Sequence, residues 1–304
     1  MNARRTFISI VCIVIVSSWT GLAGAQPAGP PAARPDVRAI QLPDGRVARL
    51  VVTWGNEGCR ARFAIDGQEP VPVHDGPVAG TIVADHGVVV LAYAVEDPRA
   101  PFRLRVSRPD GPGLGGPVSV DRPGARAGVP FAVVATSVLD GFAVFFQEVE
   151  ADDPSAAHTY LLGLDPRGVP RGPAREVEVP WSLAAVAWNG HGFQLALIYP
   201  GDGNGMRLSM VSATVDGEPQ QHPDWASRAG FIADVHLAAA GGRVLAFYRG
   251  GQGGDRLLES DVTVIRGWGS EPPAARDHGP LPQDRVIVLD TRDGDVQPRS
   301  VAAE

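Results

Sequence analysis

The sequence contains no lysine, so all 27 of its basic residues are arginines. This absence removes every mechanism that needs a primary amine on a side chain. Schiff-base catalysis, a phosphate-binding lysine of the Walker type and a serine–lysine dyad are therefore excluded within this chain.

Cysteine is also scarce, since only Cys12 and Cys59 occur. Cys12 lies in an apolar N-terminal segment that we expect to be removed, which leaves Cys59 alone in the mature chain. A single cysteine can form neither an intrachain disulfide nor a cysteine-based zinc site. We interpret Cys59 as a small, buried apolar residue next to a strand.

The sequence has no complete catalytic or phosphate-binding motif. Neither G-x-S-x-G nor H-E-x-x-H occurs. Residues 111–116 match G-x-G-x-x-G formally, but Pro117 and Val118 follow, so no helix is predicted there to bind a phosphate. The formal net charge of −7 makes nucleic acid an unfavourable partner.

Only one long apolar segment is present, and it lies at the N-terminus. Residues 1–25 combine Arg4 and Arg5, an apolar run and a small-residue cleavage site, which predicts a signal peptide. Residues 26–35 are rich in proline and alanine and are interpreted as a tether. We expect a single domain over residues 36–304, exported to the periplasm or the extracellular space and without stable membrane insertion after cleavage.

What the sequence has in abundance is turns, with 37 glycines and 28 prolines. Six glycines follow polar turn residues and precede β-prone runs, at spacings of about 42 to 54 residues. They are Gly45, Gly87, Gly141, Gly192, Gly242 and Gly294. Of these turns, Asn189-Gly190 is the strongest signal for a type I′ hairpin, because both residue types tolerate positive φ.

The run after each of these glycines predicts a strand, and the first five runs are nearly continuous in apolar residues. Such runs are typical of strands that are buried on both faces. The six predicted strands are Val47–Trp54, Val88–Ala94, Phe142–Gln147, Phe193–Tyr199, Val244–Arg249 and Val296–Val301. In the best-defined repeat, Leu183–Trp188 is the predicted strand that precedes the turn.

A third and a fourth strand are predicted in each of the first five repeats. The third strands are Arg60–Ile65, Arg103–Ser107, Thr159–Leu164, Met206–Val215 and Leu257–Ile265. Short fourth segments follow at Pro70–His74, Pro117–Val120, Ala174–Val179, Gln221–Trp225 and Glu271–Arg276. The alternation in Met206–Val215 predicts a strand near a sheet edge with one wetter face.

Four short strands for every 50 residues or so are the pattern of a β-propeller blade. In this architecture the chain resembles bacterial exported β-propeller repeat proteins over roughly residues 36–304. The predicted fold is all-β, a propeller of five or six blades with four antiparallel strands each. Six blades are preferred, with an incomplete last blade; the alternatives are a five-bladed ring closed by the C-terminal hairpin, and a pair of β-sandwiches.

Several polar residues recur at equivalent turns and therefore resemble a site. They are Asp44, Asp85, His86, Asp140 and His191. Because aspartate, asparagine and glycine are the residues that such turns require, we interpret these positions as structural.

Two loops carry oxygen ligands at spacings that resemble calcium sites, although neither completes a calcium-binding loop. The weak candidates are Asp202, Asn204, Asp290, Asp293 and Asp295. Calcium is accordingly the one cofactor considered, and the prediction is that the protein has none.

Two further groups of residues are of the types found in catalytic or binding sites. The acidic run Glu148, Glu150, Asp152 and Asp153 offers paired carboxylates of the kind used in glycoside hydrolysis, but an acidic run is more typically a solvated face. The tryptophans near strand ends could form platforms for a sugar or peptide, but packing between blades is the simpler interpretation. They are Trp54, Trp188, Trp225 and Trp268.

These patterns favour an exported, non-catalytic propeller that binds a protein or a glycan on one face, with no catalytic residue assigned. The alternative is a glycan-acting hydrolase or lyase with acidic residues at the mouth of the propeller. That alternative predicts charged side chains from several blades in one central pocket. The sequence identifies neither the ligand nor the oligomeric state.

Overall fold

The computed structural model describes residues 36–302 except 56–57, 76, 96, 98, 112, 124–127, 151–152, 154–155, 180, 201–205, 221–224, 230, 241–242, 252–261, 268–284 and 291–296. The predicted signal peptide and tether therefore lie outside the described residues. In the described part of the chain, no helix has the length and hydropathy needed to cross a membrane.

The chain folds into six successive antiparallel sheets, each formed by neighbouring strands in the sequence. The first sheet contains β1 (Asp36–Gln41), β2 (Val47–Gly55), β3 (Gly58–Ile65) and β4 (Val71–Asp75). The second contains β5 (Pro77–Asp85), β6 (Val88–Val95), β7 (Phe102–Arg108), β8 (Gly113–Leu114) and β9 (Val118–Ser119). The third contains β10 (Gly128–Val138), β11 (Gly141–Glu150), β12 (Ala157–Leu164) and β13 (Arg175–Val177).

The remaining sheets continue the same order with fewer strands toward the end of the chain. The fourth contains β14 (Ser182–Trp188), β15 (Phe193–Pro200), β16 (Met206–Ala213) and β17 (Trp225–Ala229). The fifth contains β18 (Phe231–Ala240), β19 (Arg243–Gly251) and β20 (Val262–Gly267). The last is the hairpin of β21 (Arg285–Asp290) and β22 (Gln297–Ala302). We call these sheets blades A to F.

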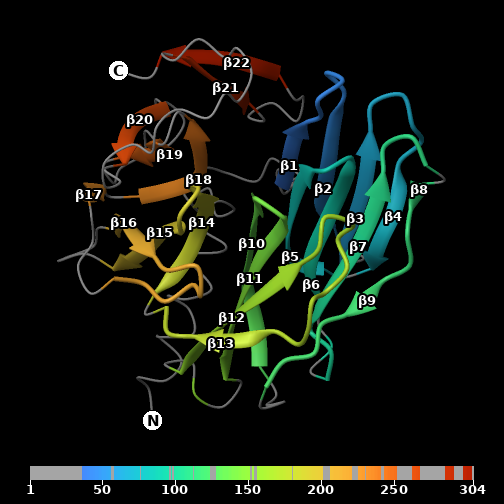
Figure 1. Ribbon diagram of the computed structural model, residues 1–304, viewed down its shortest axis with the longest axis horizontal. Helices are drawn as coiled ribbons and strands as arrows, with labels where there is room; N and C mark the ends of the chain where they lie inside the picture. Colours follow the sequence, from blue (N-terminus) through green and yellow to red (C-terminus); the bar gives the residue numbers. More distant parts are fainter. Residues whose placement is uncertain are drawn as a thin grey trace, which may run out of the picture.

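The blades are arranged around a centre, and the first strand of each of blades A to E lies closest to it (Figure 1). Strand β10 contacts β5 and β14, β14 contacts β18, and β5 contacts β1. Strand β21 contacts β1, so the C-terminal hairpin lies beside the first blade. The predicted all-β propeller is therefore confirmed, with a two-stranded sixth sheet, and the pair of β-sandwiches is excluded.

Most predicted strands agree with the structure to within a few residues, and the differences lie in blades D and E. In blade E the predicted third strand Leu257–Ile265 is described only from Val262, and the predicted fourth segment Glu271–Arg276 lies outside the described residues. The predicted fourth segment Gln221–Trp225 begins later, at Trp225. Strand β16 is a third strand between two neighbours, and Leu208–Val211 are all buried. The predicted position near a sheet edge is confirmed, since β16 lies next to the edge strand β17, but the predicted wetter face was wrong, because neighbouring blades cover both faces.

The hairpin turns use their residues differently from the prediction. Asn189 does not adopt positive φ; its side-chain oxygen instead accepts hydrogen bonds from the N–H groups of His191 and Gly192, both at 2.9 Å. The pair with positive φ at both positions is His86 (51°) and Gly87 (74°). The type I′ geometry thus occurs in blade B, and an asparagine side chain closes the turn in blade D.

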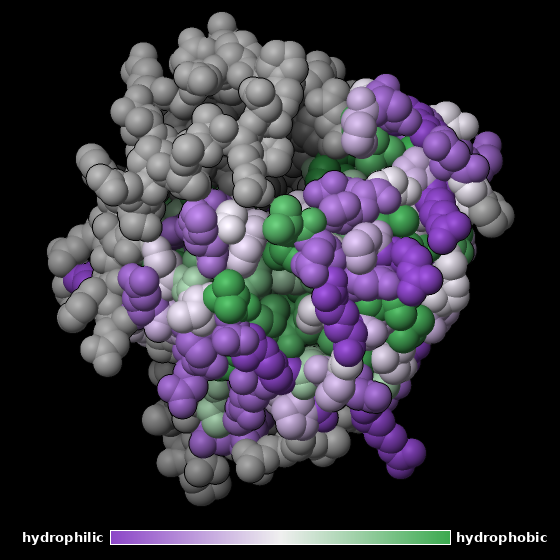
Figure 2. Space-filling model, viewed as in Figure 1, coloured by the Kyte–Doolittle hydropathy of each residue, from purple (hydrophilic) through white to green (hydrophobic). Residues whose placement is uncertain are grey.

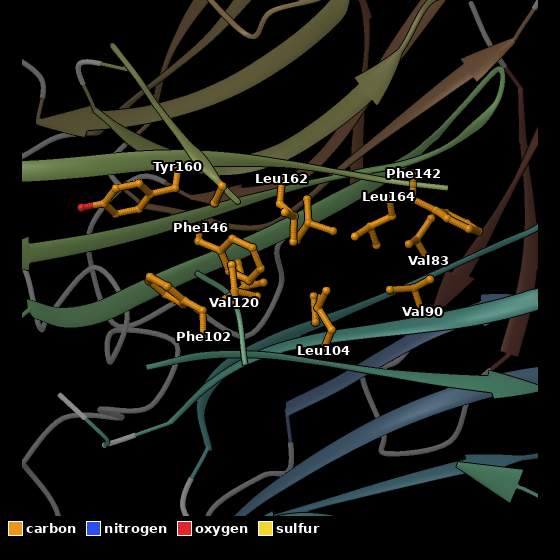
Figure 3. Packing of buried hydrophobic residues seen from close by; sticks show 14 of the residues in the cluster. Val83, Val90, Phe102, Leu104, Val120, Phe142, Phe146, Tyr160, Leu162 and Leu164 are labelled. Atoms are coloured by element: carbon orange, nitrogen blue, oxygen red, sulfur yellow. The ribbon is translucent and has the colours of Figure 1, made fainter. Parts of the chain in front are cut away.

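The hydrophobic core is divided into layers between neighbouring blades. One layer joins blades B and C, where Phe102 and Leu104 face Phe146 and Leu162 (Figure 3). Equivalent layers join A to B, C to D and D to E. Because β6, β11 and β15 contribute alternate side chains to two layers, these strands are buried on both faces, as the continuous apolar runs predicted.

Glycines in the turn between the third and fourth strands allow the blades to approach closely. A Cβ on Gly217 of blade D would lie 2.9 Å from Leu161 Cδ2 and 3.2 Å from Phe145 Cε1 of blade C. Gly168 of blade C approaches Val106 of blade B in the same manner, at 2.7 Å. Gly67 of blade A has a similar φ of 78° but nothing within 4 Å of its Cβ position.

These glycines give a matched test of packing between blades. We expect Gly217→Ala to lower the free energy of unfolding by about 2–4 kcal/mol, from positive φ and from the clash with blade C. Gly67→Ala carries the same backbone cost without the clash and should lose only about 1 kcal/mol. Urea unfolding of both variants measures the difference; equal losses would contradict the proposed role of the close approach.

Candidate functional site

The turn residues that resembled a site have structural partners. Asp44 accepts hydrogen bonds from the backbone and side chain of Arg46, and these bonds lower the pKa of its carboxyl. Asp85 accepts a bond from the His86 N–H, and Asp140 pairs with Arg171 across blade C at 2.9 Å. These contacts agree with the structural interpretation.

The calcium candidates fall largely outside the described residues. This holds for Asp202, Asn204, Asp293 and Asp295, while Asp290 is the last residue of β21. Among the described residues, no group of three or more histidine, cysteine, aspartate or glutamate side chains is arranged to hold a metal ion. The structure therefore gives the calcium hypothesis no support. The formal G-x-G-x-x-G segment includes β8 and no helix, as predicted.

The three innermost strands of blades B, C and D contribute little charge to the centre of the propeller, whereas β1 and β18 each carry two ionisable residues. Strands β5, β10 and β14 contain only one ionisable residue, Asp85, which lies exposed at the end of β5 beside the turn. Figure 2, drawn in the same view as Figure 1, shows hydrophobic side chains in the middle of the visible face of the propeller, surrounded by hydrophilic ones. A central pocket lined by charged side chains is therefore not formed by these three strands.

Charged residues gather instead at the end of blade C, where the acidic run begins. The run is not a solvated face: Gln147 and Glu148 lie in β11, and each is only 1% exposed. The prediction of a solvated face was wrong for Glu148, because its partners come from distant parts of the chain. Asp152 lies outside the described residues, and Asp153 is exposed in the loop.

Glu148 is held in the layer between blades B and C. One carboxylate oxygen accepts a hydrogen bond from the Tyr160 hydroxyl at 3.0 Å, and the other lies 3.1 Å from the Arg122 guanidinium. That guanidinium also lies over the rings of Phe102 and Tyr160. Figure 3 shows the Tyr160 hydroxyl pointing out of the apolar cluster. Burial raises the pKa of Glu148 against the opposing effect of Arg122, and burial likewise raises the pKa of Tyr160.

The start of β10 is shaped to accept this carboxyl. A Cβ on Gly128 would lie 2.5 Å from both Cδ and Oε2 of Glu148. Only glycine therefore allows the inner strand to pass over the buried side chain. The register of β10 against β11 shifts between Pro130 and Ala132, just beyond this contact.

His158 lies next to Glu148 on the same face of blade C and contacts two further carboxylates. Its Nδ1 lies 2.6 Å from Glu176 Oε1, and its Nε2 lies 3.0 Å from Glu150 Oε1. Two ionised carboxylates can both be satisfied only if both ring nitrogens carry hydrogens, which is the imidazolium form. The hydrogen bond to Glu176, with that to Glu150, raises the pKa of His158.

The residues around Glu148 and His158 form a group of six that we call the carboxylate cluster. Its members differ in access to solvent. The side chains of Arg122 and Glu148 are 3% and 2% exposed, whereas those of Glu150 and His158 are 18% and 21% exposed. The cluster thus has a buried base and an accessible end. Its members are Arg122, Glu148, Glu150, His158, Tyr160 and Glu176.

Gln147, the neighbour of Glu148, points to the opposite face of β11 and joins blade C to blade D. Its amide nitrogen donates to Thr159 Oγ1 and to the Trp181 carbonyl, both at 2.9 Å. Its oxygen accepts a bond of 2.6 Å from the Leu183 N–H. The Trp181 ring stacks on Tyr199 with a centroid distance of 4.3 Å.

Trp181 was not among the tryptophans singled out from the sequence, because its position relative to the repeat carries no signal. Of those that were, Trp188 packs edge-on against Phe193 in the layer between blades C and D, as the packing interpretation predicted. Trp54 and Trp225 lie in β2 and β17, and Trp268 lies outside the described residues.

The sequence matches no protein-family model, and it matches no curated protein. Solved structures with a similar fold include the α-L-arabinofuranosidase from Podospora anserina in complex with cellotriose. It has a TM-score of 0.48 and 14% identity over 81% of this chain and 94% of that one. The Penicillium chrysogenum α-L-arabinanase complexed with arabinobiose has a TM-score of 0.49 and 14% identity over 77% and 76% of the two chains.

A third similar structure is the α-L-arabinofuranosidase from Lactobacillus brevis, with a TM-score of 0.45 and 11% identity over 83% of this chain and 95% of that one. At these identities the likeness is one of fold. The proteins in these structures are glycoside hydrolases, which counts against the prediction of a non-catalytic binding or scaffold protein, and that prediction is withdrawn.

The buried ion pair can be tested by removing one partner. We expect Arg122→Met to lower the free energy of unfolding by about 3–5 kcal/mol at pH 7, because it leaves the Glu148 carboxyl buried without its counter-charge. The double variant Arg122→Met with Glu148→Gln should regain most of this loss, since the amide oxygen can still accept from Tyr160. A double variant no more stable than Arg122→Met, measured by urea unfolding, would contradict the pairing.

The His158 contacts predict a pH-dependent contribution to stability. Because the folded-state pKa is raised, this contribution is complete below the ordinary histidine pKa of about 6.5 and is lost as the pH rises through the raised value. We expect His158→Gln to cost about 1 kcal/mol at pH 6, given the partial exposure, and less at pH 9. Chemical denaturation at both pH values provides the measurement, and a cost independent of pH would refute the imidazolium assignment.

Proposed function

We propose that the protein is a glycan-acting hydrolase and that the accessible end of the carboxylate cluster is its active site. The observation that carries this proposal is the 3.0 Å contact between His158 and Glu150, a proton-carrying imidazole and a carboxylate that are both partly exposed. Cleavage of a glycosidic bond needs a proton for the leaving oxygen and a carboxylate on the side of the attacking water. These two side chains supply both kinds of group. Because they touch at 3.0 Å, whereas the acid and the carboxylate of a glycosidase lie about 5–10 Å apart, the proposal requires a bound substrate to separate them.

In the proposed reaction the glycosidic C–O bond breaks and the leaving oxygen takes a proton from His158. Water attacks the anomeric carbon, and Glu150 accepts the proton that the water loses. Glu176 holds the imidazole through Nδ1 at 2.6 Å, and this hydrogen bond raises the pKa of His158, which favours the protonated acid. Glu148, Tyr160 and Arg122 are positioning residues that fix the ends of β11 and β12.

The proposal also places the protein outside the cytoplasm after removal of residues 1–25, where extended glycans are available as substrates.

The test is hydrolysis by the chain beginning at residue 26, followed by the release of reducing ends. Arabinobiose, xylotriose, cellotriose and their parent polysaccharides form the substrate panel. We expect activity on at least one of them, and we expect Glu150→Gln to lower kcat by about 10²- to 10⁴-fold. Activity should fall as the pH rises through the raised pKa of His158, because the acid form is lost.

The matched control is Glu178→Gln, which removes an exposed glutamate two residues from Glu176 without touching the cluster. This variant should retain wild-type rates. Absence of hydrolysis across the panel, or equal rates for Glu150→Gln and Glu178→Gln, would overturn the proposed site.

A further inference from the structure

We propose that Trp181, braced on Tyr199, is a binding platform for a sugar ring of a neutral glycan. This inference deepens the proposed function by adding a binding subsite at the same end of blade C as the carboxylate cluster, and it rests on that function only for the choice of ligand class. The platform lies at the start of blade D, outside the carboxylate cluster.

The indole of Trp181 is stacked on one side and still substantially exposed. The ring planes of Trp181 and Tyr199 differ by only 20°, so Tyr199 covers one face of the indole. Trp181 is nevertheless 43% exposed, which is unusual for so large an apolar side chain. Tyr199 is itself fixed, because its hydroxyl is hydrogen-bonded to the buried Ser209 Oγ at 2.9 Å.

The backbone that carries the indole is held equally firmly. The buried Gln147 side chain bonds both the Trp181 carbonyl and the Leu183 N–H, so the segment is tied to β11 on each side of residue 182. A rigid aromatic group binds a ligand with little loss of side-chain entropy. The exposed tryptophan is therefore preorganised, in contrast to an apolar side chain at the tip of a turn.

A sugar ring fits this platform because its axial C–H groups form an apolar face while its hydroxyls remain in water. The flat indole of Trp181 suits the apolar face of the sugar. The formal net charge of −7 opposes a polyanionic glycan, so the occupant is neutral. Gln147 and Glu148 are adjacent in β11, so the platform and the carboxylate cluster lie at the same end of this strand, on opposite faces of blade C.

The test is affinity gel electrophoresis of the chain beginning at residue 26 in gels that contain soluble arabinoxylan or xyloglucan, with polygalacturonate as the acidic arm. We expect retardation by at least one neutral polysaccharide and a loss of affinity of about tenfold or more in Trp181→Ala. Trp181→Phe should retain part of the affinity. Leu139→Ala, which removes a more exposed apolar side chain from the β10–β11 turn, should bind as the wild type does.

Because binding and cleavage are measured in different assays, the platform and the active site can each be disproved independently of the other. Glu150→Gln should bind as tightly as the wild type, and retardation without hydrolysis would support the platform while overturning the active site. Equal retardation of Trp181→Ala and wild type, at equal melting temperature, would overturn the platform and leave the active site intact. The platform is also overturned if only polygalacturonate retards the protein, or if none of the three polysaccharides does.

Discussion

The end of β11 is the constraint on which the middle of this propeller depends. Two consecutive residues there are polar, fully buried and directed to opposite faces of the sheet. Gln147 bonds the backbone that begins blade D, and Glu148 bonds the arginine that lies between blades B and C. Since a buried polar group without a partner costs about 1–3 kcal/mol, the two residues make the positions of both neighbouring blades interdependent.

Apolar packing alone would not fix the blades so specifically. The layers between blades are built from valine, leucine, alanine and phenylalanine, which tolerate small sliding movements at little cost. Hydrogen bonds do not tolerate such movements, because they require a narrow range of distances and angles between donor and acceptor. The close approach of Gly217 to Leu161 and Phe145 adds a steric limit to movement within the C–D layer.

The repeat in the sequence predicted this architecture well, because a propeller is made of local hairpins. Strands such as β6 and β15 were identifiable from apolar runs next to a turn, and both are pairings between neighbours in the chain. The site was not identifiable in this way. Glu148 was interpreted as part of a solvated acidic run because its partners, Arg122 and Tyr160, are 26 and 12 residues away in a fold that the sequence gives only in outline.

Trp181 is a second residue whose contacts could not be identified from the sequence. Nothing in its neighbours Pro180 and Ser182 distinguishes an exposed tryptophan from a buried one, and its stacking partner Tyr199 belongs to the next strand of the hairpin. Pairing register in blade D had to be known before the two rings could be placed together. Positions that depend on register or on contact between blades are therefore the ones that periodicity does not reveal.

The location of the carboxylate cluster follows from the same physical logic. An ion pair such as Arg122–Glu148 is a poor way to gain stability, since apolar residues of similar size would pack in the layer without the cost of burying two charges. What the pair does provide is a fixed, polar end to an otherwise apolar layer, with Tyr160 as the boundary. His158 and Glu150 can then be held at the surface in one arrangement, which is the requirement for a proton donor and a carboxylate to act on the same bond.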